Sequence, residues 1–173
     1  PGEGGAASRD TLGTLFAEAQ RANPAYEAMH LFNARGLAVA SSLPAAIGKL
    51  NVTERHYFQD VVAGKPILSH VLKSIATGNP IVAVAHPVRD GSGVRGFVLI
   101  SLDLSRVSQQ MLARTKFLES GYAFMVDDLG VFITHPNPEL ILKAKLDDYD
   151  WGRQIAQLRN GELYYTFNGV EKM

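Results

Sequence analysis

One pattern occurs twice in this chain and limits what it can fold into. An apolar run is followed by Asn or Asp, two spacer residues, a glycine and a second apolar run, first at residues 29–41 and again at 123–135. The polar side chain and the glycine, Gly36 or Gly130, are typical of the short turn of a β-hairpin. Two such hairpins, each followed by a helical stretch and further strands, predict two α+β modules in tandem.

The first module is expected to contain five strands. We expect strands at residues 26–33, 37–41, 66–74, 81–88 and 96–104, a helix at 8–22 and a short helix at 51–62. Turn sequences rich in Gly, Pro and Asn, at 77–80 and 90–93, join the last three strands. Connections this short require antiparallel neighbours, because a parallel crossover takes about a dozen residues or more. The predicted fold is therefore a PAS-like antiparallel sheet with helices on one side.

The second module reads as a shorter copy of the first. A connecting helix is expected at 105–118, then the second hairpin at 122–135, a helix at 138–146 and a strand at 161–168. Compared with the first module, the last strands are missing, so the second module is expected to be incomplete. The predicted organisation is a helical lead-in at 1–24, a first PAS-like module at 25–104, a connecting helix at 105–120 and a truncated second module at 121–173.

Composition and charge exclude several classes of function. Lys and Arg together number 17, as do Asp and Glu, so no basic field is available for nucleic acid or an anionic membrane. Cysteine is absent, which excludes disulfides, thiolate metal ligands and thiol nucleophiles. The 5 histidines form no i, i+4 pair on a predicted helix, and we expect neither a metal nor another cofactor. The apolar stretches are strand-length, shorter than the roughly 18 residues of a membrane-spanning helix.

Four segments carry a family likeness through their order and spacing. Residues 51–64 contain Arg-x-aromatic-aromatic with a trailing glycine, 76–88 read as a strand pair, 93–104 as a closing strand, and 121–136 as the opening of a second module. Together they resemble the double Cache family, the extracytoplasmic ligand-binding domains of bacterial chemoreceptors and sensor histidine kinases. The likeness covers roughly residues 25–170. The family's long first helix is represented only in part, and its last strands are absent.

The resemblance implies a sensor domain without catalytic activity of its own. It would be the periplasmic portion of an inner-membrane chemoreceptor or histidine kinase, whose parent chain carries the output domain, such as a kinase or cyclase. The implied partners are a small-molecule ligand, foremost an organic acid with an amino acid or amine as alternatives, and a second receptor copy in a homodimer. Ligand binding in the membrane-distal first module would bias the packing of the connecting helix and the membrane-proximal second module.

Arg55 is the first candidate for ligand binding. Its guanidinium offers a planar fork of donors that suits a carboxylate and stays charged when partly desolvated. From the residues alone, a solvated arginine with Tyr57 and Phe58 in the core explains the same pattern. The resemblance favours a pocket, because the counterparts of Arg55 and Tyr57 in amino-acid-binding relatives hold the ligand carboxylate. Phe58 is then expected to form an apolar wall.

Ser101 bears on the class of ligand. Relatives that bind α-amino acids place an Asp on the last strand to hold the ammonium group, and Ser101 is the matching position here; Asp103 shares its face or caps the next helix. A hydroxyl does not replace a carboxylate beside a desolvated ammonium. We therefore expect a ligand without an essential amine, such as a carboxylic or hydroxy acid. His70 and His86, on adjacent strands, are expected to tune selectivity if they face the helical side.

Three other classes of function stay open at this point. They are a dimerisation or structural module without a ligand, an intracellular PAS-type domain with a cofactor, and a hydrolase. The hydrolase is disfavoured, because the chain has no Gly-x-Ser-x-Gly elbow or P-loop. Ser69 and His70 do not make a catalytic pair either, because neighbours on a strand point to opposite faces.

Overall fold

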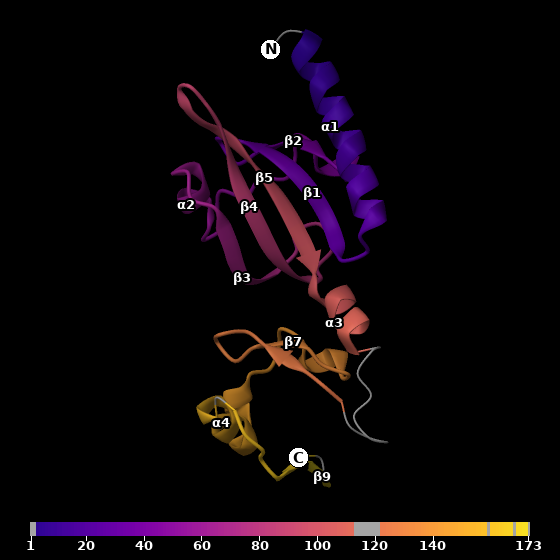
Figure 1. Ribbon diagram of the computed structural model, residues 1–173, viewed down its shortest axis with the longest axis vertical. Helices are drawn as coiled ribbons and strands as arrows, with labels where there is room; N and C mark the ends of the chain where they lie inside the picture. Colours follow the sequence, from indigo (N-terminus) through magenta and orange to yellow (C-terminus); the bar gives the residue numbers. More distant parts are fainter. Residues whose placement is uncertain (1–2, 113–121, 159, 168, 173) are drawn as a thin grey trace. The chain divides into compact units, whose positions relative to one another are not determined.

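The computed structural model describes residues 3–112, 122–158, 160–167 and 169–172 (Figure 1). The chain divides into two compact units, Pro1–Val107 and Ser108–Met173. Each unit has its own hydrophobic core. No helix within the described part of the chain combines the length and the apolar character needed to cross a membrane.

The first unit is built on one five-stranded antiparallel sheet. Its strands lie in the order β2-β1-β5-β4-β3, and every neighbouring pair is antiparallel. The elements up to residue 112 are α1 (Glu3–Ala22), β1 (Tyr26–Asn33), β2 (Ala38–Ser41), η1 (Pro44–Ala46), α2 (Phe58–Val62), β3 (Ile67–Lys73), β4 (Pro80–Asp90), β5 (Gly93–Asp103) and α3 (Leu104–Leu112). Helix α1 packs against β1 and β2 (Figure 1). The predicted PAS-like α+β sheet is thus confirmed.

Local chemistry fixes the first hairpin. The Asn33 side-chain oxygen accepts the backbone N–H groups of Arg35 at 2.9 Å and Leu37 at 3.1 Å, which closes the turn. Gly36 has a φ of +76°, a left-handed conformation that side-chain-bearing residues rarely adopt. A Cβ at this position would also lie 2.9 Å from the Thr53 methyl carbon. The turn therefore requires both the asparagine and the glycine.

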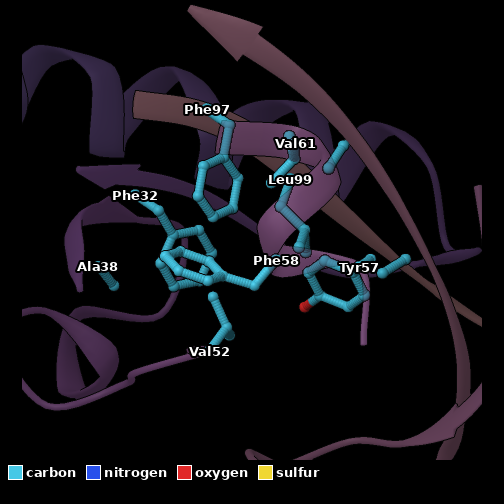
Figure 2. Packing of buried hydrophobic residues seen from close by; sticks show 10 residues of the cluster. Phe32, Ala38, Val52, Tyr57, Phe58, Val61, Phe97 and Leu99 are labelled. Atoms are coloured by element: carbon cyan, nitrogen blue, oxygen red, sulfur yellow. The ribbon is translucent and has the colours of Figure 1, made fainter. Parts of the chain in front are cut away.

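An aromatic cluster forms the core of the first unit (Figure 2). Phe32 of β1 and Phe97 of β5 stack with ring centroids 5.0 Å apart, and Phe58 of α2 meets Phe97 edge-on at 6.3 Å. Val52 and Tyr57, from the segment between β2 and α2, flank these rings. The strand residues of this cluster occupy alternate positions, as expected for one face of a sheet. The core therefore ties the β2–α2 segment to the inner face of the sheet.

Strand β1 departs from strict alternation at its start. Tyr26 pairs with Leu102 and Ala28 pairs with Ser101, so Glu27 is an extra residue with no partner on β5. A bulge of this kind redirects a side chain. Glu27 and Ala28 are consequently both buried, although they are neighbours on one strand.

The helix expected at 51–62 is shorter in the structure. It begins only at Phe58, because the preceding residues form turns closed by their own side chains. The Asn51 side-chain oxygen accepts both the backbone N–H of Thr53, at 2.9 Å, and its hydroxyl, at 2.7 Å. Residues 51–53 thus form a turn and do not start a helix.

Two other helices also differ from their expected bounds. The first helix, expected at 8–22, already begins at Glu3. The connecting helix expected at 105–118 is observed as Leu104–Leu112. The remainder of that expectation, residues 113–118, lies outside the described residues.

The second unit contains two small two-stranded sheets and a short helix. Trp151 stacks between Tyr149 and Tyr165, with ring centroids 5.1 Å and 4.7 Å apart. These rings form the centre of its core. The elements are β6 (Met125–Val126), β7 (Phe132–Thr134), η2 (Pro138–Leu140), η3 (Leu146–Asp148), α4 (Asp150–Gln157), β8 (Tyr165–Phe167) and β9 (Val170–Lys172).

The prediction of a helix at 138–146 is wrong. Only a 3-10 turn forms, at Pro138–Leu140. Leu142 then has a φ of +59°, which ends any helix, and its backbone N–H donates to Phe132 O at 2.9 Å. Helix α4, at Asp150–Gln157, was not expected from the sequence.

Candidate functional site

A pocket opens on the inner face of the five-stranded sheet, in the first unit. Its floor comes from β1, β4 and β5, one wall from the segment between β2 and α2, and the other from the end of β3 and the connection that follows it. It contains about 30 Å³ that the centre of a water molecule can reach, and about 380 Å³ of atom-free space when the open solvent at its mouth is counted. Its polar lining residues are Glu27, His30, Arg55, Tyr57, Ser74 and Ser101.

Arg55 bridges two walls of this pocket. The turn that carries it is closed by a bond of 3.0 Å from the Arg55 N–H to Val52 O. Its guanidinium Nη2 donates to Lys73 O, at the end of β3, at 2.8 Å. This bond uses one of the five N–H donors of a guanidinium and orients the rest of the group. The side chain is half-buried, so a carboxylate entering the pocket would meet a positioned, permanently charged donor.

Tyr57 adds a neutral donor to the same wall. Only 4% of the residue is exposed, and burial raises the pKa of its phenol to about 12, an effect that the nearby Arg55 charge opposes only in part. The hydroxyl therefore stays protonated at any physiological pH. Within the described part of the chain, it makes no hydrogen bond with another residue. Tyr57 is thus available to donate to a ligand.

Ser101 lies on the pocket floor, whereas Asp103 does not line it. Asp103 Oδ1 accepts the backbone N–H groups of Ser105, at 2.9 Å, and Arg106, at 3.2 Å, and so caps α3. Its Oδ2 accepts from the Asn79 side-chain amide at 3.1 Å. Oδ1 thus makes the helix cap, which was one of the two roles that the sequence left open, and Oδ2 is bonded to Asn79.

Three of the predicted site residues lie outside the pocket. Phe58 is buried in the aromatic core. His86 is exposed on the opposite face of β4, where its Nδ1 lies 3.1 Å from Pro87 O. His70 is also exposed, because β3 is bulged between Leu68 and Val71, and its ring lies 5.5 Å from that of His56. The expectation that all six predicted residues share one pocket is corrected for these three.

Glu27, like His30 and Ser74, lines the pocket but was not predicted from the sequence as a site residue. It is 7% exposed, and its two carboxylate oxygens accept the hydroxyls of Ser74, at 2.9 Å, and of Thr77. Strict alternation would place Glu27 on the outer face with Met29 and Leu31, and the bulge in β1 turns it inward instead. Only a prediction of the register between β1 and β5 could have found it.

His30 lies on the same strand, is buried and lines the pocket. Its Nδ1 is 2.8 Å from the Ser41 hydroxyl, and its ring lies 5.5 Å from that of Phe32. Burial lowers the pKa of the imidazole from 6.5 to about 4. The pocket therefore contains a neutral histidine at physiological pH.

Acid is expected to destabilise the first unit through His30. Between pH 6.5 and about 4 the imidazole takes up a proton in the unfolded chain but not in the folded one, so stability falls as the pH falls through this window. The full effect is on the order of 3 kcal/mol. Unfolding free energies from pH 7 to pH 4 should therefore decline less steeply in His30→Gln than in the wild type. If the unfolding free energy depended on pH equally in both proteins, the lowered pKa of His30 would be contradicted.

The chain is similar in sequence to proteins of a known family. The family model described as a Cache domain matches residues 4–173. The methyl-accepting chemotaxis protein TlpB of Bacillus subtilis is 32% identical over 124 residues, which is 69% of this chain and 17% of that protein. The chain thus spans about a fifth of the length of the curated relatives it matches.

Solved structures agree on the fold. The ligand-binding domain of the Pseudomonas aeruginosa chemoreceptor PctB, in complex with L-Arg, matches with a TM-score of 0.63 and 22% identity, over 97% of this chain and 76% of that one. The sensor domain of the Vibrio cholerae histidine kinase DctB matches with a TM-score of 0.62 and 21% identity, over 86% of this chain and 58% of that one.

Proposed function

Because this chain belongs to the Cache domain family of ligand-binding sensor domains, we propose that its first unit binds a small carboxylate-bearing molecule. The observation that carries the proposal is the pair of donors on one pocket wall. Arg55 supplies a positioned guanidinium, and Tyr57 supplies a phenol whose proton is kept by burial. A charged donor makes a shorter and stronger hydrogen bond to a carboxylate than a neutral donor does, and the phenol adds a second donor.

The parent protein is, in this proposal, a chemoreceptor anchored in the inner membrane. The curated relatives in support of it are methyl-accepting chemotaxis proteins. Residues 25–104 would form the membrane-distal module and residues 121–173 the membrane-proximal one, with the output domain elsewhere in the parent chain. The receptor would act as a homodimer, and its sensor domain would break no bond, because signalling needs only a difference in ligand affinity between two packings.

Removal of the Arg55 guanidinium should abolish most of the binding. We expect a thermal-shift screen of organic acids, amino acids and amines to give a carboxylate hit that raises Tm by several degrees. Arg55→Ala should weaken that ligand by about 10- to 100-fold in a titration, because a charge-assisted hydrogen bond is lost. Arg35→Ala is the matched control, since Arg35 lies exposed in the β1–β2 turn and outside the pocket.

The result would separate the competing functions. A carboxylate hit that Arg55→Ala leaves intact would overturn the anchor assignment. No hit from any class would favour a dimerisation module without a ligand. A coloured cofactor in the purified protein would favour the PAS-type cofactor domain.

A further inference from the structure

We propose that Glu27 is a specificity residue of the pocket and that it binds a primary ammonium group on the ligand. The inference deepens the proposed function and rests on it, because it concerns the same pocket. It assigns the ligand class as a molecule carrying an amine as well as a carboxylate. In amino-acid-binding relatives the residue that holds the amine is on the last strand, whereas here it would be on the first.

The bulge in β1 is the first observation in support. Glu27 is the unpaired residue between Tyr26 and Ala28, and it is the residue whose side chain alternation alone would send to the opposite face. Both Glu27 and Ser74 line the pocket. Bulges are frequent beside binding sites, where they redirect a side chain toward the ligand.

The hydroxyls that surround Glu27 are oriented to donate. Ser74 Oγ accepts the backbone N–H groups of Ala76 and Thr77, both at 3.2 Å, so its own proton is directed at Glu27 Oε2. Thr77 Oγ1 accepts the Asn79 N–H at 3.2 Å and donates to Glu27 Oε1 in the same way. These contacts occupy about half of the roughly four lone-pair sites of a carboxylate. Acceptor capacity is therefore left on both oxygens.

Neither of these donors carries a charge. No ion pair among residues 3–112, the described part of the first unit, involves Glu27, and the guanidinium of Arg55 donates to Lys73 O instead. A buried carboxylate without a cation is costly, and a cation brought by the ligand offsets that cost. An ammonium offers three donors and a compact charge, which suits the remaining acceptor sites.

The same pocket thus has an acceptor group and a donor wall. Arg55 and Tyr57 match a carboxylate, and Glu27 matches an ammonium. The serine at position 101 therefore does not exclude an amine from the ligand, because the expected carboxylate is supplied by another strand. A zwitterion uses both charged groups of the pocket at once.

Calorimetric titration with matched pairs of compounds tests the inference. The probes are L-alanine with propionate, L-asparagine with succinamate, and 4-aminobutyrate with butyrate, in which the members differ by the amine. In the wild type, the amine member of a binding pair should bind at least about 10-fold more tightly than its partner. Glu27→Gln should weaken the amine member by about 10- to 100-fold and leave its partner nearly unchanged. Glu18→Gln, on the exposed side of α1, is the matched control and should change neither.

The outcomes distinguish a failure of the role of Glu27 from a failure of the carboxylate proposal. Equal affinity for both members of a pair, or unchanged affinity in Glu27→Gln, overturns the role of Glu27 while the carboxylate proposal stands. If butylamine binds as tightly as 4-aminobutyrate and its binding is lost in Glu27→Gln, the result supports Glu27 and overturns the role of Arg55. No binding of any probe overturns both. If Glu27→Gln does not fold, the role of Glu27 is tested by the ratio of the two affinities within each pair, measured in the wild type.

Discussion

Replacing Gly96 with alanine is expected to lower the unfolding free energy of the first unit by about 4 kcal/mol or more. A Cβ at this position would lie 2.1 Å from Phe32 O and 3.2 Å from the Asn33 Cα, which are backbone atoms of the neighbouring strand. Backbone cannot rotate aside as a side chain does, so β1 and β5 would have to separate at their pairing. Thermal and denaturant unfolding, followed by circular dichroism, measures the loss.

Gly91→Ala is the control for this substitution. Gly91 lies in the β4–β5 turn, has no atom within 4 Å of an added Cβ, and is not in the left-handed region. It should be neutral or stabilising by up to about 1 kcal/mol, because alanine restricts the unfolded chain. A Gly96→Ala protein as stable as Gly91→Ala would show that β1 and β5 are not paired at this register.

Truncating Phe97 to alanine should cost about 3–5 kcal/mol, the usual range for a buried aromatic. Phe97 is 0% exposed and contacts both Phe32 and Phe58, so its removal leaves a cavity where β1, β5 and α2 meet (Figure 2). A loss of this size corresponds to a drop in Tm of roughly 10–20 °C for a unit of this length. The measurement is again the Tm and the free energy of unfolding.

Val98→Ala tests whether the loss of stability depends on the face of the sheet that the side chain occupies. Val98 is the next residue on β5, points to the opposite side and is only half-buried, so its truncation should cost about 1 kcal/mol or less. Similar losses at both positions would mean that the strand does not present Phe97 to the core. The pair of variants therefore tests the side-chain alternation of β5 directly.

The parts of the fold that depend on near neighbours in sequence were predictable. The first hairpin matches its expected bounds almost residue for residue, because Asn33 and Gly36 close the turn by themselves. The antiparallel order of β3, β4 and β5 followed from two short connections. The helix expected at 138–146 failed because the backbone at Leu142 is left-handed, which no pattern of apolar residues reveals.

The candidate site was predictable only in part, for a related reason. Arg55 and Tyr57 belong to one short segment, so the spacing of the motif carries them to one wall together. Glu27 depends on a bulge, which is a property of the pairing of two strands that are far apart in sequence. Strand periodicity assumes a regular ladder, and it assigns the wrong face wherever that ladder is interrupted.

The connection between β3 and β4 joins two structures that are otherwise separate. At one end, Ser74 and Thr77 bond to Glu27 in the pocket; at the other, Asn79 bonds to Asp103, which caps α3. A side-chain cap contributes about 1 kcal/mol to its helix, enough to shift a two-state equilibrium about fivefold. The six residues of this connection thus link the carboxylate of the pocket to the first turn of α3 through hydrogen bonds at their two ends. A molecule that competed for the Ser74 and Thr77 hydroxyls would therefore disturb the segment that holds Asn79 against the cap of α3.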